Sequence, residues 1–357
     1  MNGENNVRDN EKGKYFTCVD YLKRRFDSMP KKLAFRAETK NEWQSWRNKL
    51  INKLKDLTGY NTMQACSLQS KVTEKVEREG FLRERVEVQT EPGVIMPIYV
   101  LIPKEFDCQR LPAVIAAHGH HSGGKITVAG CVEIPGVAER IRNYNYDYGV
   151  QFVREGFIVF CPDARGFGER REATAQNNDN PFTSSCEQLN HMAYPLGQTV
   201  IGMWAWDISR IIDYIKERRD CDPNRVGCVG LSGGGMQTLW ASAFDDRIGC
   251  AVISGYFFDY RYLVNASLGN CSCNFVPHLY KYANMGDIAA LIAPRPLLIE
   301  RGTKDELSDG VEGEQYEIIK KAYNLLEAED RLETDIFEGG HMWHGVKAIP
   351  WMKKWLK

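Results

Sequence analysis

Hydrophobic and polar positions repeat with three different periods along the chain. Two early stretches, 15–29 and 40–57, carry apolar residues at three- and four-residue spacing with charges between them, which predicts amphipathic helices. Between about 70 and 103 the period becomes two, which predicts antiparallel strands with one face in water. The alternating runs are KVTEKVERE, FLRERVEVQT and MPIYVLIP.

From Leu111 onward, short and nearly continuous apolar runs alternate with longer helical ones. The apolar runs are AVIAA, GFIVFCPD, RVGCVGL, IGCAVISG and RPLLIERG, and the helical ones are YGVQFVREG, MWAWDISRIIDYIKERR, GMQTLWASAF and EQYEIIKKAYNLLEAE. Strands that are buried on both faces and alternate with helices form parallel sheets. We therefore predict an α/β fold with a mostly parallel central sheet, helices on both faces, and an N-terminal extension of helices and antiparallel strands.

The length of 357 residues exceeds what one simple core usually holds. We expect a helical extension over residues 1–69 that packs on the core and a catalytic domain over 70–357. The segment 173–197 is polar and without a clear period. Loops of that length inside compact domains are usually lids or binding loops, so we interpret this one as a lid-like insertion.

The charge is balanced, with 46 basic and 47 acidic residues. This balance argues against nucleic acid or an anionic membrane as a partner. The first residues are polar, and no run approaches the ~20 apolar residues of a membrane span. The 11 cysteines follow no repeating spacing, which is typical of a reducing compartment. We expect a cytoplasmic protein, although a signal removed from the sequence stays open. Cys271 and Cys273 form a C-x-C pair without a second ligand pair, and we interpret them as structural.

The strongest chemical signal is the pattern G-x-S-x-G around Ser232, between a predicted strand and a predicted helix. In this arrangement the serine lies in a sharp turn whose neighbours must be small, and its Oγ projects above the sheet. The start of the following helix supplies backbone N–H groups beside a developing oxyanion. We predict that Ser232 is a nucleophile.

A serine nucleophile needs a base, and the base needs a carboxylate that orients it. In this architecture the chain order is serine, then acid, then histidine. Asp305 follows the strand RPLLIERG, with Glu306 and Asp309 as less favoured alternatives in the same loop. His341 follows two glycines after the strand LETDIFE, and His344 is its less favoured competitor.

The stretch HGHHSGGK at 118–125 raises the question of a metal site. A binuclear hydrolase motif H-x-H-x-D-H would need aspartate at Ser122 and histidine at Gly123. Because that ligand set fails, we predict no metal here.

The same stretch fits an oxyanion hole. Such a hole takes one backbone N–H from the loop after an earlier strand and one from the residue after the serine. We predict that His120 and Gly233 donate these two N–H groups, with His121 the less favoured first donor. His118 would then be structural, its ring hydrogen-bonded to the loop.

These motifs, in this order, resemble the α/β-hydrolase superfamily. The chain is most similar to the acetyl xylan esterase and dienelactone-hydrolase-like branch of bacterial esterases, from about residue 35 to the end. The supporting segments are HGHHSGGK, PDARGFGERRE, MWAWDISRIIDYI, LIAPRPLLIERGTKD and GGHMWHG. The resemblance implies no metal and no organic cofactor. Sugar deacetylases of this kind usually carry tyrosine where this chain has His120, and this departure leaves the acyl specificity open.

Further polar and aromatic residues flank these motifs. Asp163 and Arg165 in PDARGFGER, and Asp207 on the next helix, look like braces of the polar turn rather than catalytic groups.

For substrate contacts we select His121, Phe257 and Trp343. The aromatic residues Phe258 and Tyr260 and the segment 173–197 are further candidates, and a place for the aromatics in the core is an equal alternative.

The residues together predict a serine-dependent carboxylic ester hydrolase that acts through an acyl-enzyme. The resemblance implies a small-molecule ester as the substrate, an acetylated sugar first. Two alternatives stay open: a serine peptidase or amidase on the same scaffold, and a non-catalytic binding protein. A metallohydrolase is a distant third. The sequence does not decide whether the protein is a homo-oligomer.

Overall fold

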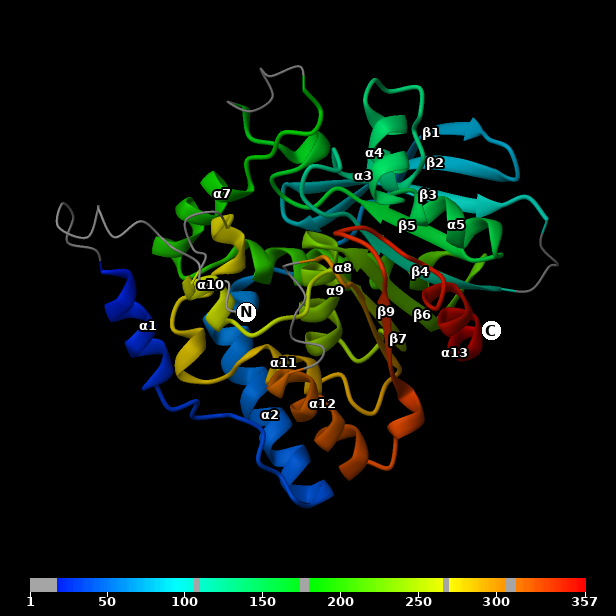
Figure 1. The fold of residues 1–357 in the computed structure, drawn as a ribbon. Helices are drawn as coiled ribbons and strands as arrows, with labels where there is room; N and C mark the ends of the chain where they lie inside the picture. Colours follow the sequence, from blue (N-terminus) through cyan, green and yellow to red (C-terminus); the bar gives the residue numbers. More distant parts are fainter. Residues whose placement is uncertain (1–17, 106–109, 174–179, 266–269, 306–312) are drawn as a thin grey trace, which may run out of the picture.

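A single mixed sheet runs through the molecule in the computed structural model (Figure 1). The structure describes residues 18–105, 110–173, 180–265, 270–305 and 313–357. The strands are β1 (Lys71–Glu77), β2 (Phe81–Glu91), β3 (Val94–Pro103), β4 (Leu111–Ala117), β5 (Ile158–Pro162), β6 (Cys221–Leu231), β7 (Cys250–Ser254), β8 (Leu297–Gly302) and β9 (Leu332–Phe337). Their order is β1-β2-β3-β5-β4-β6-β7-β8-β9.

The sheet is antiparallel from β1 to β5 and parallel from β5 to β9. The predicted fold class, a mostly parallel sheet with an antiparallel N-terminal part, is confirmed. The parallel register aligns the carboxyl ends of β4, β6, β8 and β9 at one edge of the sheet, where the loops that follow these strands lie side by side.

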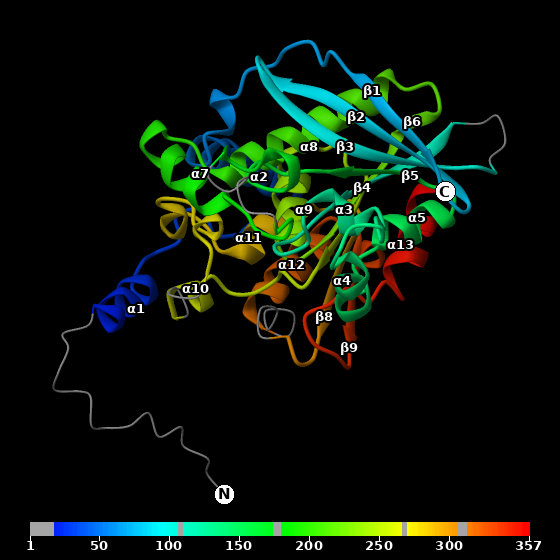
Figure 2. The same cartoon turned by 90° about the horizontal axis from the view of Figure 1, so that it is seen from above.

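Helices cover both faces of the sheet (Figure 2). Successive residues of β4 alternate between two hydrophobic clusters, Ala113 and Ile115 in one and Val114 and Ala116 in the other. Helices α8 and α9 pack into the first cluster, and α5 and α13 into the second. The helices are α1 (Val19–Asp27), α2 (Lys40–Leu57), α3 (Lys125–Val128), α4 (Val137–Tyr144), α5 (Tyr148–Arg154), α7 (Cys186–Ala193), α8 (Val200–Glu217), α9 (Gly233–Phe244), α10 (Arg261–Asn265), α11 (Met285–Ala290), α12 (Glu314–Leu325) and α13 (Ala348–Leu356).

The second N-terminal helix, α2, joins the same core as α8 and α9. It begins at a capping box, in which the Thr39 side chain accepts from the Glu42 N–H and the Glu42 carboxylate accepts from the Thr39 N–H. Such a box satisfies N–H groups that no helical carbonyl reaches. Leu50 and Leu54, at four-residue spacing, are fully buried in the first cluster.

The described part of the expected lid-like insertion is partly helical. Residues 186–193 form α7, and a short 3-10 turn follows at Tyr194–Leu196. Residues 174–179 of that segment lie outside the described residues. In the part of the chain that the structure describes, no helix combines the length and the apolar character that crossing a membrane requires.

Candidate active site

Ser232 lies in a sharp turn between β6 and α9. Its φ of 61° and ψ of −119° lie in a region that residues other than glycine rarely adopt. The turn holds because the Ser232 N–H donates to the Ser254 carbonyl at 2.9 Å. Glycine is required around it: a Cβ on Gly234 would lie 2.0 Å from the Ala117 oxygen. This is the strained strand-to-helix turn that the motif predicts.

His341 and Asp305 form a hydrogen-bonded pair beside the serine. The His341 Nδ1 lies 2.8 Å from the Asp305 Oδ2, and the Asp305 side chain is 3% exposed. Gly255 permits this approach, since a Cβ there would lie 3.0 Å from the His341 Cε1. Because Nδ1 is bonded to the carboxylate, Nε2 is the ring nitrogen left for proton transfer. The alternative acids Glu306 and Asp309 lie outside the described residues.

The competing histidine, His344, belongs to a different pair. Its Nδ1 lies 2.8 Å from the Asp335 Oδ2, and its ring stacks on Phe337 with the ring centroids 4.3 Å apart. Its backbone N–H donates to the buried Glu300 carboxylate. His344 is therefore part of the support of the loop and does not line the pocket that contains Ser232.

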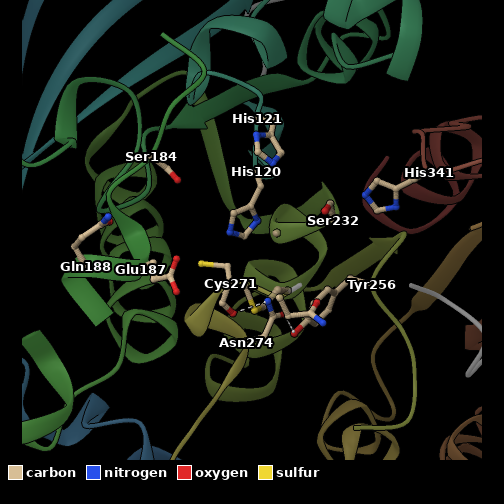
Figure 3. Close-up of a pocket in the computed structure, with 13 residues that line it drawn as sticks. His120, His121, Ser184, Glu187, Gln188, Ser232, Tyr256, Cys271, Asn274 and His341 are labelled. Atoms are coloured by element: carbon tan, nitrogen blue, oxygen red, sulfur yellow. Dashed lines mark hydrogen bonds between the residues drawn. The ribbon is translucent and has the colours of Figure 1, made fainter. Parts of the chain in front are cut away.

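A cavity of about 550 Å³ opens over the serine. It is lined by Ser232, Gly233, His120, His121 and His341, among others. In the view of Figure 3, Ser232 lies between the rings of His120 and His341. The structure thus brings the predicted nucleophile, base and oxyanion residues to one cavity of a size usual for small-molecule sites.

Two of the three residues selected for substrate contact do not line the cavity. Phe257 and Trp343 are both fully buried. Trp343 packs against Tyr148 in the core, with ring centroids 4.8 Å apart, and its Nε1–H donates to Gln151. The side chain that lines the cavity after β7 is instead Tyr256, one residue before Phe257. Phe258 and Tyr260 are also fully buried.

The loop after β4 has the form that an oxyanion hole needs. A Cβ built on Gly233 would lie 3.4 Å from the His120 backbone nitrogen, so the two candidate donors are close. The His118 ring bonds the Gly119 carbonyl through Nδ1 and accepts from the Ala164 N–H through Nε2, each at 3.0 Å. Burial lowers the pKa of His118 to about 4, so the ring is neutral and structural, as predicted.

Buried ion pairs support this loop and the turn after β5. The Asp163 carboxylate accepts from the Lys125 N–H at 2.7 Å and pairs with the Lys125 Nζ. Asp207 pairs with Arg165 and Arg170. Burial alone would raise the pKa of Asp207, but the two arginines outweigh it and lower that pKa to about 2. The interpretation of Asp163, Arg165 and Asp207 as braces is confirmed.

A group of four side chains that the sequence did not bring together lies at the cavity. Cys186, Cys271 and Cys273 approach the His120 ring, and the ligand atoms of these four residues lie within 4.8 Å of one another. Cys271 also lines the cavity. Of this group the sequence shows only the C-x-C pair of Cys271 and Cys273. The other two members have no spacing signal, because 66 residues separate His120 from Cys186 and 85 separate Cys186 from Cys271.

Known proteins match both the sequence and the fold. A family model described as "Abhydrolase family" matches residues 6–342. The Bacillus subtilis (strain 168) protein named "Putative hydrolase YtaP" is 28% identical over 293 residues, which cover 78% of this chain and 90% of that protein.

Two solved structures have the same fold. A structure described as a "putative acetyl xylan esterase" from Bacteroides fragilis NCTC 9343 has a TM-score of 0.77 at 19% identity, covering 98% of this chain and 97% of that one. A glucuronoyl esterase from Solibacter usitatus has a TM-score of 0.64 at 15% identity, covering 92% of this chain and 98% of that one.

Proposed function

This chain belongs to the Abhydrolase family, and from that premise we propose that it is a serine-dependent carboxylic ester hydrolase that removes small acyl groups from carbohydrates. The observation that carries the proposal is the pairing of His341 with Asp305 at 2.8 Å in the cavity that also contains Ser232. A nucleophile in a strained turn, a base and a carboxylate that orients the base are the parts that acyl transfer through serine requires.

The reaction has two steps. The Ser232 Oγ attacks the ester carbonyl while the His341 Nε2 takes its proton, and the alcohol leaves with that proton as the tetrahedral intermediate collapses to an acyl-serine. Water then attacks the acyl-serine, with His341 again as the base, and releases the acid. Asp305 holds the imidazole in the tautomer that exposes Nε2. The backbone N–H groups of His120 and Gly233 stabilise both oxyanions.

The lining of the cavity favours a polar alcohol as the leaving group. Ser184, Glu187, Gln188, Tyr256 and Asn274 supply hydroxyl, carboxylate and amide groups. Such groups pair with sugar hydroxyls, which would otherwise lose their bonds to water on binding. The two structural relatives described above are a "putative acetyl xylan esterase" and a glucuronoyl esterase, which also favours a carbohydrate ester.

The His120 ring packs closely against Gly233. The His120 Nδ1 would lie 2.7 Å from a Cβ on Gly233, so the histidine ring closes the space beside the oxyanion donors. This crowding supports a short acyl group such as acetyl.

The test is hydrolysis of p-nitrophenyl esters from acetate to octanoate by the wild type and by Ser232→Ala. We expect a preference for acetate and a loss of about 10³-fold or more in kcat for the variant. Ser242→Ala is the matched control: Ser242 lies on α9, the helix that Ser232 precedes, is buried, and its hydroxyl has no hydrogen-bond partner among the described residues.

Acetylated xylo-oligosaccharides and methyl esters of glucuronic acid then separate the two carbohydrate classes. Ester hydrolysis that survives Ser232→Ala would refute Ser232 as the nucleophile. A wild type that cleaves none of these esters would refute the esterase proposal and direct the search to amide substrates.

A further inference from the structure

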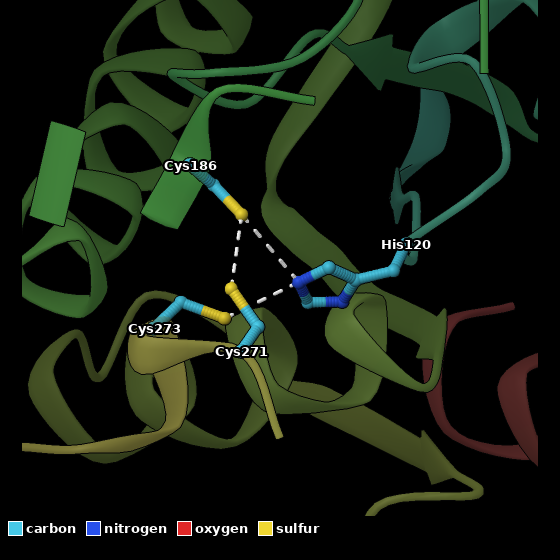
Figure 4. Close-up of side chains that lie close together, drawn as sticks. All are labelled: His120, Cys186, Cys271 and Cys273. Carbon is cyan, nitrogen blue, oxygen red and sulfur yellow. Dashed lines mark hydrogen bonds between the residues drawn. The ribbon is translucent and has the colours of Figure 1, made fainter. Parts of the chain in front are cut away.

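Four side chains with metal-binding atoms lie close together (Figure 4), and two of them, His120 and Cys271, line the cavity. The His120 Nε2 lies 3.2 Å from the Cys273 Sγ and 3.6 Å from the Cys186 Sγ. The Cys186 and Cys271 sulfurs are 3.2 Å apart. Three separate segments supply these groups: the loop after β4, the first residue of α7, and the turn around the 3-10 helix η5 (Ser272–Asn274).

We propose that His120, Cys186, Cys271 and Cys273 bind one zinc ion. Three thiolates and one imidazole are an established ligand set for tetrahedral Zn²⁺. With Zn–S bonds of about 2.3 Å, such a tetrahedron has edges of roughly 3.8 Å. The ligand atoms here lie within 4.8 Å of one another and as close as 3.2 Å, so small side-chain rotations bring all four to bonding distance.

Apolar packing alone does not require three thiols to gather around one ring nitrogen. Cys161 and Cys250 behave as ordinary buried cysteines, each within a hydrophobic cluster of the sheet. Cys186 and Cys273 also lie in a hydrophobic cluster, but their sulfurs point at a polar ring, and the Cys186 sulfur also contacts another thiol. Because a thiol is a weak donor and a weak acceptor, these contacts stabilise little by themselves. A soft metal ion would replace them with four strong bonds.

The backbone around the cysteines is held by other contacts. The Asn190 side chain and the Tyr194 hydroxyl donate to the Ser272 carbonyl at 2.7 and 3.0 Å. The same Tyr194 hydroxyl lies 2.7 Å from the Phe275 carbonyl, so its one proton is shared between the two acceptors. Because these bonds tie α7 to η5, the thiols are brought together by the fold, and the site exists before an ion arrives.

The site has no open position, since all four ligands come from the protein, and this is typical of structural zinc. Its ion would tie the His120 ring to α7 and η5, which form one wall of the cavity. If the proposed function holds, His120 also donates an oxyanion N–H, and its side chain is a positioning residue. Loss of the ion would then lower kcat more than it changes KM, because the donor would lose its alignment with the transition state.

The direct test is metal analysis of the full-length protein, purified under reducing conditions without chelator. We expect roughly one zinc ion per chain, and cobalt substitution should give the absorption of a tetrahedral thiolate site. Cys271→Ala is the variant of choice, because Cys271 is only partly buried and the fold should tolerate its loss. It should lose the metal on dialysis against a chelator, while the matched control Cys161→Ala, which removes a buried thiol outside the group, keeps it.

The zinc content does not depend on activity, so Ser232→Ala should carry as much zinc as the wild type. This separates failure of the zinc site from failure of the esterase proposal. A reduced protein that contains no zinc and takes up no cobalt would overturn the inference. An intact mass that is lower than calculated by two hydrogen atoms, and that returns to the calculated value on reduction, would also overturn it. A Cys186–Cys271 disulfide would then explain the short distance between the two sulfurs. Equal metal content in Cys271→Ala and the wild type would also overturn it.

Discussion

Two histidine–aspartate pairs lie at the C-terminal end of this fold and are nearly identical in local geometry. In each pair an Nδ1 lies 2.8 Å from an Oδ2, in His341–Asp305 and in His344–Asp335. The histidine side chains are 30% and 29% exposed, and both carboxylates are buried. A bond length and an exposed fraction therefore cannot tell a base from a structural histidine.

The surroundings of the two pairs differ. His341 faces the cavity that contains Ser232. The His344 N–H and the Gly345 N–H both donate to the Glu300 carboxylate of β8, at 2.7 and 2.8 Å. The His344–Asp335 pair thus fixes the loop to the sheet. The same loop carries His341, so its attachment holds His341 in the cavity.

The largest difference should appear when each histidine is removed. His341→Ala should lower kcat for p-nitrophenyl acetate by about 10³-fold or more, since the base is lost. His344→Ala should keep kcat within a few-fold and lower the melting temperature, because it breaks a buried support. Steady-state kinetics and thermal unfolding check both. A comparable loss of kcat in the two variants, with both folded, would mean that the pairs are not functionally distinct.

Replacing the two aspartates should give the same contrast in kcat, with a somewhat smaller effect than replacing the histidines. Asp305→Asn should lower kcat by roughly 10²- to 10⁴-fold, because an amide stabilises the wrong tautomer of His341. Asp335→Asn should leave kcat nearly unchanged. The pH profile adds a second readout: a rate loss in Asp305→Asn that reverses at high pH would indicate a changed tautomer rather than a disordered loop.

The turn around Ser232 and the choice of His341 as the base could both be predicted from the sequence. The turn around Ser232 was predictable because its glycines have a steric purpose that any G-x-S-x-G between a strand and a helix shares. The two glycines before His341 favoured it over His344, and the structure places His341 in the cavity.

Side-chain direction was not predictable. Tyr256 lines the cavity while Phe257 and Phe258 are fully buried. These residues follow the end of β7, where no regular period fixes the direction of the side chains. The C-x-C pair of Cys271 and Cys273 was visible in the sequence, but its partners His120 and Cys186 were not, because they come from distant segments that only tertiary folding brings together.

A smaller effect is expected at Glu300, which holds the loop of the second pair. Burial raises its pKa above the ordinary 4.5, although bonds from Ser254 and two backbone N–H groups oppose this. A raised carboxyl pKa contributes stability that is present below about pH 4.5 and is lost as the pH rises through the folded-state pKa. The cost of Glu300→Gln, about 1–3 kcal/mol, should therefore be largest near pH 4 and decrease toward pH 8. Urea unfolding of both proteins at several pH values measures it, and a cost that grows with pH would contradict the assigned direction.

The smallest effect concerns the ring beneath the second histidine. Phe337 stacks on His344 with the planes 13° apart, and an aromatic contact of this kind contributes about 0.5–1.5 kcal/mol beyond burial. Phe337→Leu keeps most of the apolar volume, so it should lower the free energy of unfolding by about 1 kcal/mol and leave kcat within twofold of the wild type. The double variant with His344→Ala should cost less than the sum of the two single variants, because the contact can be lost only once. If the costs in free energy of unfolding are additive, the stacking contributes nothing to stability. A large fall in kcat for Phe337→Leu would show that the His344–Asp335 pair affects catalysis.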